Sequence, residues 1–121
     1  MYQIIKIGDQ DVPMRSSAAT QYRFKAVFGT DLMSALSRAN KSPENQTEAA
    51  ELIPQLGYIM AKQADNSTEW RKLNFEAFLE WADQYDPSGM AMAAPEIVQI
   101  YSSSARTTST PKNPGGAPSG R

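Results

Sequence analysis

The sequence of 121 residues contains no cysteine and no histidine. The lack of cysteine excludes disulfides and thiolate chemistry, and it fits a reducing compartment. Because histidine is missing as well, the usual zinc sites, histidine-activated nucleophiles and imidazole general bases are excluded. Only carboxylates, Lys and Tyr remain for acid–base chemistry, and we expect no cofactor or metal.

A strong net charge and long apolar runs are also missing. The formal net charge of −1 is too small to gather nucleic acid or an anionic membrane surface. The longest uncharged run near the middle, residues 52–61, contains Pro54 and Gly57 and is shorter than the ~20 apolar residues of a membrane helix. The start of the chain lacks a signal-peptide pattern. We therefore expect no nucleic-acid or membrane partner, and a protein that stays in the cytosol in which it is made.

The first fifteen residues have the pattern of a β-hairpin. Residues 2–7 are a run of β-formers, residues 8–11 are typical of a turn, and residues 12–15 form a second extended piece. Pro13 cannot donate a hydrogen bond to a neighbouring strand, which places it in an edge or bulged strand.

Helical spacing dominates the chain after the hairpin, because apolar residues recur at intervals of three and four. Thr20, Asp31 and Asn74 are candidate N-caps, and Gly29 is a candidate helix end. The predicted helices cover residues 20–28, 32–39, a segment that starts at Ser42 or Thr47 and ends at Asp65, residues 75–82, and residues 90–101. Pro54 and Pro95 are expected to kink or interrupt their helices, since an interior proline costs about 3 kcal/mol.

Aromatic and methionine side chains are the predicted core. The aromatic residues at helical spacing are Tyr22, Phe24, Phe28, Trp70, Phe75, Phe78, Trp81 and Tyr85. Packing in the core is favoured over stacking on nucleic-acid bases, because their neighbours are acidic. The methionines Met60, Met90 and Met92 fill gaps in the core or, alternatively, form an adaptable surface for a partner helix.

The last twenty residues differ from the rest in composition. Residues 102–121 include 14 Ser, Thr, Pro or Gly, and they carry Arg106, Lys112 and Arg121 with no acid. Such a segment cannot bury enough apolar surface to offset its ordering entropy. We predict a mainly α protein in which a small N-terminal β-hairpin precedes a bundle of five or six short helices, with one domain over residues 1–101 and a disordered tail over residues 102–121.

Short stretches spread over most of the chain up to Tyr101 carry a family resemblance. They are Gly8-Asp9-Gln10-Asp11-Val12-Pro13, then Ala18-Ala19-Thr20 with Arg23-Phe24-Lys25, then Phe28-Gly29-Thr30-Asp31-Leu32, and further on Leu56-Gly57-Tyr58-Ile59-Met60-Ala61-Lys62-Gln63-Ala64-Asp65 and Ala94-Pro95-Glu96-Ile97-Val98. In content and order they resemble segments of the tail assembly chaperones of long-tailed phages and prophages of Gram-positive bacteria.

The resemblance implies a function without catalysis. Several copies of such a chaperone coat the tape measure protein in the host cytoplasm, keep its apolar helices soluble, help tail tube subunits assemble around it and then leave, so that the mature virion lacks them. It also implies self-association and a longer companion product, made by programmed ribosomal frameshifting, that contacts the tail tube protein. Pro111-Lys112-Asn113 can be encoded as CCA AAA AAC, which contains a slippery heptamer, and Pro114-Gly115-Gly116 can hide a run of G.

Two other functions remain as alternatives. The chain could be a structural tail or head-completion component retained in the virion, or a carboxylate-dependent enzyme that uses the acidic residues Glu76, Glu80, Asp83 and Asp86. An enzyme would need a buried carboxylate pair in a pocket, whereas these residues have the spacing of a solvated helix face.

No motif marks the partner-binding surface of the predicted chaperone. We expect it on the exposed parts of the last helix and of the third helix. The candidate residues are Tyr58, Ile97, Ile100 and Tyr101. The alternative is that all four belong to the core.

Overall fold

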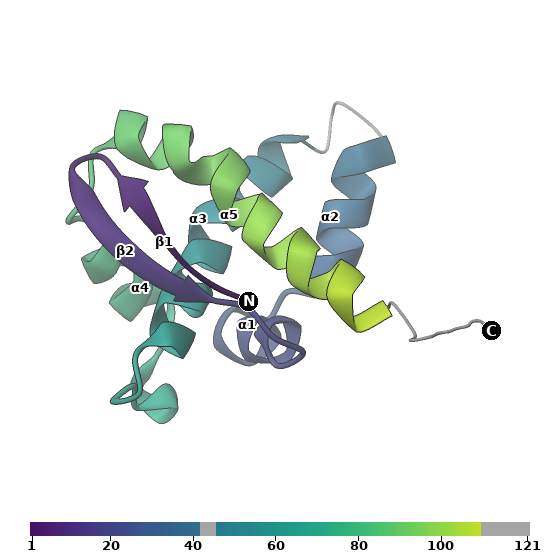
Figure 1. The fold of residues 1–121 in the computed structure, drawn as a ribbon, viewed down its shortest axis with the longest axis horizontal. Coiled ribbons are helices and arrows are strands. Elements are labelled where there is room, and N and C mark those ends of the chain that lie inside the picture. The colour runs from purple at the N-terminus through teal and green to yellow at the C-terminus, as the bar shows by residue number, and fades with distance from the viewer. Residues whose placement is uncertain (42–45, 110–121) are drawn as a thin grey trace.

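The computed structural model describes residues 1–41 and 46–109. Their elements, in chain order, are β1 (Tyr2–Ile7), β2 (Gln10–Arg15), α1 (Thr20–Phe28), α2 (Leu32–Lys41), α3 (Gln46–Ala64), the 3₁₀ helix η2 (Trp70–Lys72), α4 (Phe75–Ala82) and α5 (Pro87–Ser109). The predicted fold class, a mainly α protein with an N-terminal β-hairpin, is confirmed. Figure 1 shows α5 crossing the front of the molecule, with the hairpin on one side and α2 on the other.

The strands β1 and β2 form a two-stranded antiparallel sheet. Its turn is Gly8-Asp9, two residues shorter than predicted, and Gly8 has a φ of 63°, which glycine adopts without steric cost. Beyond the strands, the main-chain groups of Met1 and Ser16 exchange hydrogen bonds of 2.7 and 2.8 Å. Because hydrogen-bonded and non-hydrogen-bonded pairs alternate, the pair of Ile4 and Pro13 is a non-hydrogen-bonded one.

Pro13 therefore removes no bond between the two strands. Its missing N–H lies on the outer edge of β2, which pairs only with β1 among the described residues. The predicted placement of Pro13 in an edge strand is thus confirmed.

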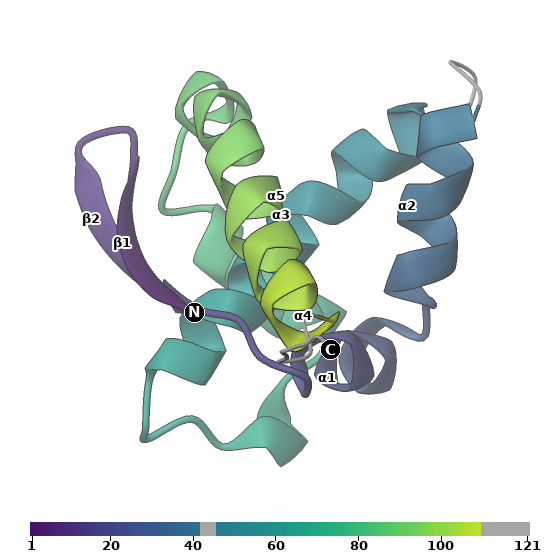
Figure 2. The same cartoon turned by 45° about the vertical axis from the view of Figure 1, so that its right-hand side comes forward.

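The two faces of the hairpin differ. One face carries Ile5, Ile7, Val12 and Met14, all buried, and β2 packs on α3 while β1 packs on α5. The side chains on the other face are exposed. Turning the molecule shows the hairpin and α2 on opposite sides of α5 (Figure 2).

The helices α3 and α5 run through their prolines, so neither helix is interrupted at Pro54 or Pro95. Leu52 and Leu56 flank Pro54 and are buried, as is Ile97 beyond Pro95. Each such side chain contributes about 1.5–3 kcal/mol on burial, which offsets the loss of one helical hydrogen bond. Neither helix is short.

The helix ends match the predictions in part. α3 begins at Gln46, next to the predicted start at Thr47, whereas the alternative start at Ser42 lies outside the described residues. α5 continues to Ser109, beyond the predicted end at Tyr101. The remainder of the predicted tail, residues 110–121, also lies outside the described residues.

Local capping was predictable in most places. The side chain of Asn74 accepts a 2.9 Å hydrogen bond from the N–H of Ala77 at the start of α4, and Gly29 ends α1 with a φ of 75°. Asp31 accepts from the N–H of Ser34 at the start of α2. Thr20, however, is the first residue of α1 and not its N-cap. Its hydroxyl accepts a hydrogen bond from the N–H of Ser17, which precedes the helix.

The core lies where α3 meets the other elements. Leu56, Ile59 and Met60 of α3 are fully buried. Among the aromatic residues predicted for the core, Phe24, Phe78 and Trp81 are buried, whereas Phe28, Trp70 and Tyr85 are half-buried. Tyr22 and Phe75 are instead 68% and 51% exposed, so their prediction as core residues is wrong. Of the other two methionines, Met90 packs partly on the core and Met92 is 80% exposed.

Candidate binding site

The four residues expected to bind a partner are all buried. Ile97 and Ile100 are 0% and 1% exposed, and Tyr58 and Tyr101 are 1% and 7% exposed. The prediction that they form an exposed surface is therefore wrong, and the alternative that they are core residues is correct. The apolar sides of α3 and α5 face each other and the hairpin, so neither helix has an uncovered apolar side at these positions.

Tyr58 lies inside an aromatic cluster. Its ring centroid is 5.6 Å from that of Phe78, 5.4 Å from that of Trp81 and 6.2 Å from that of Phe28. The hydroxyl is buried, and none of the described residues forms a hydrogen bond with it. Burial raises the pKa of Tyr58, and the negative charge of Glu80 raises it further. This environment suits a neutral core tyrosine.

At Tyr101 and Ile100, α5 is joined to other elements. The hydroxyl of Tyr101 donates to Sδ of Met33 at 2.9 Å, and the carbonyl of Ile100 accepts a 3.1 Å bond from the buried hydroxyl of Ser16. Burial raises the pKa of Tyr101, with a smaller contribution from the charge of Asp31. These contacts hold α5 against α2 and the end of the hairpin.

An apolar surface on α4, which we call the α4 patch, is exposed instead. It consists of Phe75 and Leu79, which are 51% and 38% exposed and stand one helical turn apart. The ring of Phe75 meets the half-buried ring of Phe28 edge to face at 6.5 Å, which connects the patch to α1. The exposed acids Glu76, Glu80 and Asp83 also lie on α4 or at its end. An apolar strip among acids is the surface that an amphipathic helix with basic flanks would cover.

The outer face of the hairpin is a second exposed apolar surface. Tyr2 and Ile4 are each 54% exposed, and Ile4 is paired with the exposed Pro13. Charged residues border this surface, because Arg15 lies over the ring of Tyr2 at 5.7 Å and Lys6 pairs with Asp11 at 3.1 Å.

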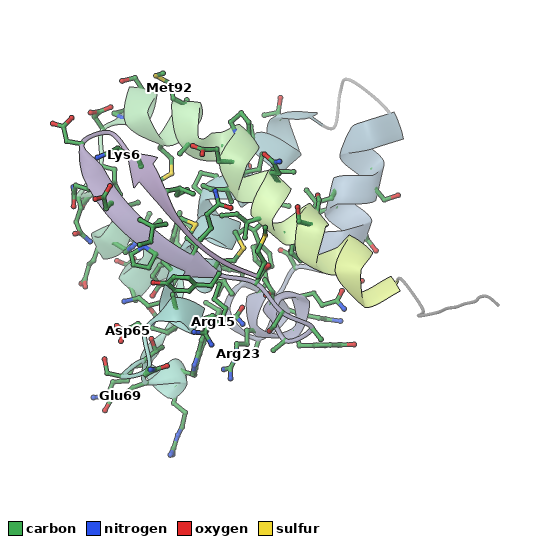
Figure 3. The ribbon with its side chains drawn as sticks, in the orientation of Figure 1. Lys6, Arg15, Arg23, Asp65, Glu69 and Met92 are labelled. Atoms are coloured by element: carbon green, nitrogen blue, oxygen red, sulfur yellow. The ribbon has the colours of Figure 1, made fainter. Side chains whose placement is uncertain are left out.

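A basic hollow of about 330 Å³ lies below the hairpin, and Arg15, Arg23, Lys62, Asp65 and Trp70 contribute to its lining. Figure 3 shows Arg15 and Arg23 close together in this region, with Asp65 beside them. The three cations come from β2, α1 and α3. The guanidinium carbon of Arg23 is 4.0 Å from the ring centroid of Trp70, a distance at which cation–π attraction is effective.

No sequence pattern indicated a role for the cations of the basic hollow, although Arg23 and Lys62 fall in the stretches that carry the resemblance. These cations lie on three different elements and meet only when β2, α1 and α3 pack together. One local signal existed, because Arg23 has no acidic residue three or four positions away and therefore no partner on its own helix face.

The carboxylates considered for an enzyme do not form a buried pair. Glu76, Glu80, Asp83 and Asp86 are all exposed. Asp86 serves the start of α5, where hydrogen bonds from the N–H of Gly89 at 2.6 Å and from the hydroxyl of Ser88 at 2.8 Å lower its pKa. These four residues therefore do not provide the buried carboxylate pair that a carboxylate-dependent enzyme would need.

Comparison of the chain with protein-family models, curated proteins and solved structures gives no match. Within residues 1–41 and 46–109, no helix has both the length and the apolar character needed to cross a bilayer. The candidate surfaces are therefore assessed from their own chemistry.

Proposed function

We propose that the chain is a tail assembly chaperone, which binds and solubilises the tape measure protein of a long-tailed phage and assists tail tube assembly. Two lines of support meet in this proposal. One is the resemblance of the stretches from Gly8 to Val98 to that family. The other is the α4 patch, the observation that carries the proposal, because Phe75 and Leu79 offer apolar surface that the fold itself leaves uncovered.

The α4 patch suits a helical client better than the four buried residues do. A tape measure protein with amphipathic helices could lay an apolar side over Phe75, Leu79 and the edge of Phe28, while its basic side chains meet Glu76 and Glu80. Binding of this kind needs no bond to be made or broken. It is also reversible, as required of a chaperone that acts in the host cytoplasm and is absent from the mature virion.

Co-expression with the tape measure protein encoded nearby tests the proposal. We expect the wild-type chain to raise the soluble yield of the tape measure protein and to co-purify with it. The double substitution Phe75→Ala and Leu79→Ala should weaken the complex about tenfold or more, because an apolar side chain contributes about 1.5–3 kcal/mol on burial and 1.4 kcal/mol corresponds to a factor of ten. Met92→Ala is the matched control, since it removes an 80% exposed apolar side chain from α5.

Three results would contradict the proposal. The soluble yield of the tape measure protein could be independent of this chain, or Met92→Ala could weaken the complex as much as the double substitution. Stoichiometric amounts of the chain in purified virions would instead favour a structural component. The proposed companion product and its contact with the tail tube protein are tested separately, by reading the gene at the codons for Pro111–Asn113 and Pro114–Gly116 and by mass spectrometry of the infected cell.

A further inference from the structure

Among the described residues, the cations of the basic hollow form no salt bridge, although the charge of Lys62 acts weakly on the nearby Asp65. Elsewhere on the surface Lys6 pairs with Asp11 at 3.1 Å and Lys72 pairs with Glu69 at 2.6 Å. The charged groups of Arg15, Arg23 and Lys62 instead lie over the rings of three aromatic residues. Cation–π contact of this kind fixes a guanidinium by its face and leaves its N–H groups available at the edge.

Within the described part of the chain, Asp65 is the one acid that lines the basic hollow, and it already forms hydrogen bonds of its own. Oδ1 of Asp65 accepts hydrogen bonds from the N–H and the hydroxyl of Ser67, at 2.9 and 2.7 Å. These bonds are the main cause of its lowered pKa, and the charge of Lys62 is the smallest one. Three cations against one acid leave the hollow with a formal charge of +2.

An apolar hollow of about 370 Å³ adjoins the basic one. It is lined in part by Val12, Pro13 and Trp81, and it shares Lys62 and Asp65 with the basic hollow. Because Val12 and Pro13 point to opposite faces of the hairpin, a hollow that both of them line lies at the free edge of β2. Pro13 has no N–H to offer there, so a partner strand could not form a full ladder along this edge.

We propose that these adjoining hollows bind a short acidic segment of a protein partner. The carboxylates of the segment would pair with Arg15, Arg23 and Lys62, and an apolar side chain next to them would enter the hollow beside Trp81. Arginine held in a fixed orientation favours paired hydrogen bonds to a carboxylate. This site is separate from the α4 patch and goes beyond the proposed chaperone function.

A long polyanion such as nucleic acid fits this surface less well. The chain has 13 acidic and 12 basic residues, and three of the basic ones lie after Tyr101, which leaves 9 basic against 13 acidic residues up to that point. A phosphate backbone extending beyond the hollow would therefore meet like charge. A short segment with a few carboxylates stays within the hollow and avoids this repulsion.

The test uses the full chain and a synthetic, end-capped peptide in which Glu residues flank a Leu, compared with the same peptide carrying Gln in place of Glu. We expect the acidic peptide to shift the NMR signals of the Arg15 and Arg23 side chains and of the Trp70 indole, with an affinity that falls as salt is added. The Gln peptide should bind about tenfold more weakly or not at all.

Matched variants test whether binding depends on the cations of the hollow or only on the net charge of the protein. Arg15→Gln with Arg23→Gln should weaken binding about tenfold, whereas Lys6→Gln with Lys25→Gln, which removes the same charge elsewhere, should change it less than twofold. Lys62→Gln alone should weaken binding about threefold, which keeps the test valid if the double arginine variant fails to fold. The variant of the α4 patch should bind the acidic peptide like the wild type.

The proposal is overturned if the Gln peptide binds as well as the acidic one or if the two double variants weaken binding equally. It also fails if the signals of Arg15, Arg23 and Trp70 do not move. Tighter binding of a single-stranded oligonucleotide than of the acidic peptide would assign the hollow to nucleic acid instead. Failure of the acidic-segment proposal would not affect the chaperone proposal, because the chaperone proposal depends on Phe75 and Leu79.

Discussion

Tyr58 places a hydroxyl group inside an aromatic cluster where no described group bonds to it. A buried polar group without a partner costs about 1–3 kcal/mol relative to its solvation in water. The ring itself is well packed, with neighbours on α1 and α4. At this residue the unpaired hydroxyl therefore lowers the stability of the protein, while the packed ring raises it.

We predict that Tyr58→Phe stabilises the protein by about 1 kcal/mol, because it removes the unpaired hydroxyl and keeps the ring. The melting temperature should rise by about 4 °C, measured by circular dichroism or calorimetry. Tyr22→Phe, at a residue that is 68% exposed, is the control and should leave it unchanged. A loss of stability in Tyr58→Phe would mean that a buried water bonds to the hydroxyl.

The crossing of α3 and α5 depends on a residue without a side chain. Gly57 is buried in α3, and a Cβ at this position would lie 3.0 Å from Cδ1 of Ile97 and 3.4 Å from Cε of Met14. Alanine would strengthen the helix by up to about 1 kcal/mol, but overpacking a core costs about 1–3 kcal/mol. Because Ile97 is fully buried, its methyl group has little room to move.

We therefore predict that Gly57→Ala destabilises the protein by about 1 kcal/mol, and that Ile97→Val relieves much of this loss by removing Cδ1. In chemical denaturation the double variant should be more stable than the sum of the two single changes indicates. Strict additivity would show that the two helices can separate locally without cost. It would then contradict the packing argument.

The elements also show what a sequence can and cannot predict. The caps at Asn74 and Gly29 depend on neighbours within one helical turn, and both were predicted. At Pro54 the local preference left either a kink or an interruption open, and α3 is not interrupted there, because burial of the side chains around Pro54 outweighs that preference. Phe75 was predicted to lie in the core with Phe78, because helical spacing identifies the apolar side of a helix. The spacing does not show how much of that apolar side other elements cover.

The binding surfaces were harder to predict than the elements. The four residues expected to bind a partner carry large, mainly apolar side chains on the inner sides of their helices, where the fold buries them. The basic hollow combines Arg15, Arg23 and Lys62, whose sequence neighbours give no indication that they meet. Surfaces of this kind are properties of tertiary packing, so a single sequence does not reveal them.

At the scale of the whole molecule, tyrosines make stability sensitive to high pH. Burial raises the pKa values of Tyr58, Tyr85 and Tyr101 above the ordinary value of 10.0. In the unfolded chain these groups lose their protons near pH 10, whereas the folded protein retains them to higher pH. The folded state then binds more protons than the unfolded state, so stability falls as pH rises.

We predict that the free energy of unfolding is steady up to about pH 10 and declines above it, over the pH range in which these tyrosines are ionised in the unfolded chain and still protonated in the folded protein. Denaturation curves recorded at a series of alkaline pH values would measure this decline. Replacing Tyr58, Tyr85 and Tyr101 together by Phe should reduce the slope. An unchanged slope would assign the alkaline loss of stability to other groups.

The first and last described elements touch at two points, and this has a consequence for biosynthesis. Gly8 at the hairpin turn lies so near Gly89 that a Cβ on Gly89 would come within 3.0 Å of the Gly8 nitrogen, and Ser16 bonds to Ile100 at 3.1 Å. A nascent hairpin therefore cannot cover Ile5 and Ile7 fully until α5 has left the exit tunnel. At about 5–20 residues per second, translation leaves this apolar face exposed for several seconds before α5 can cover it.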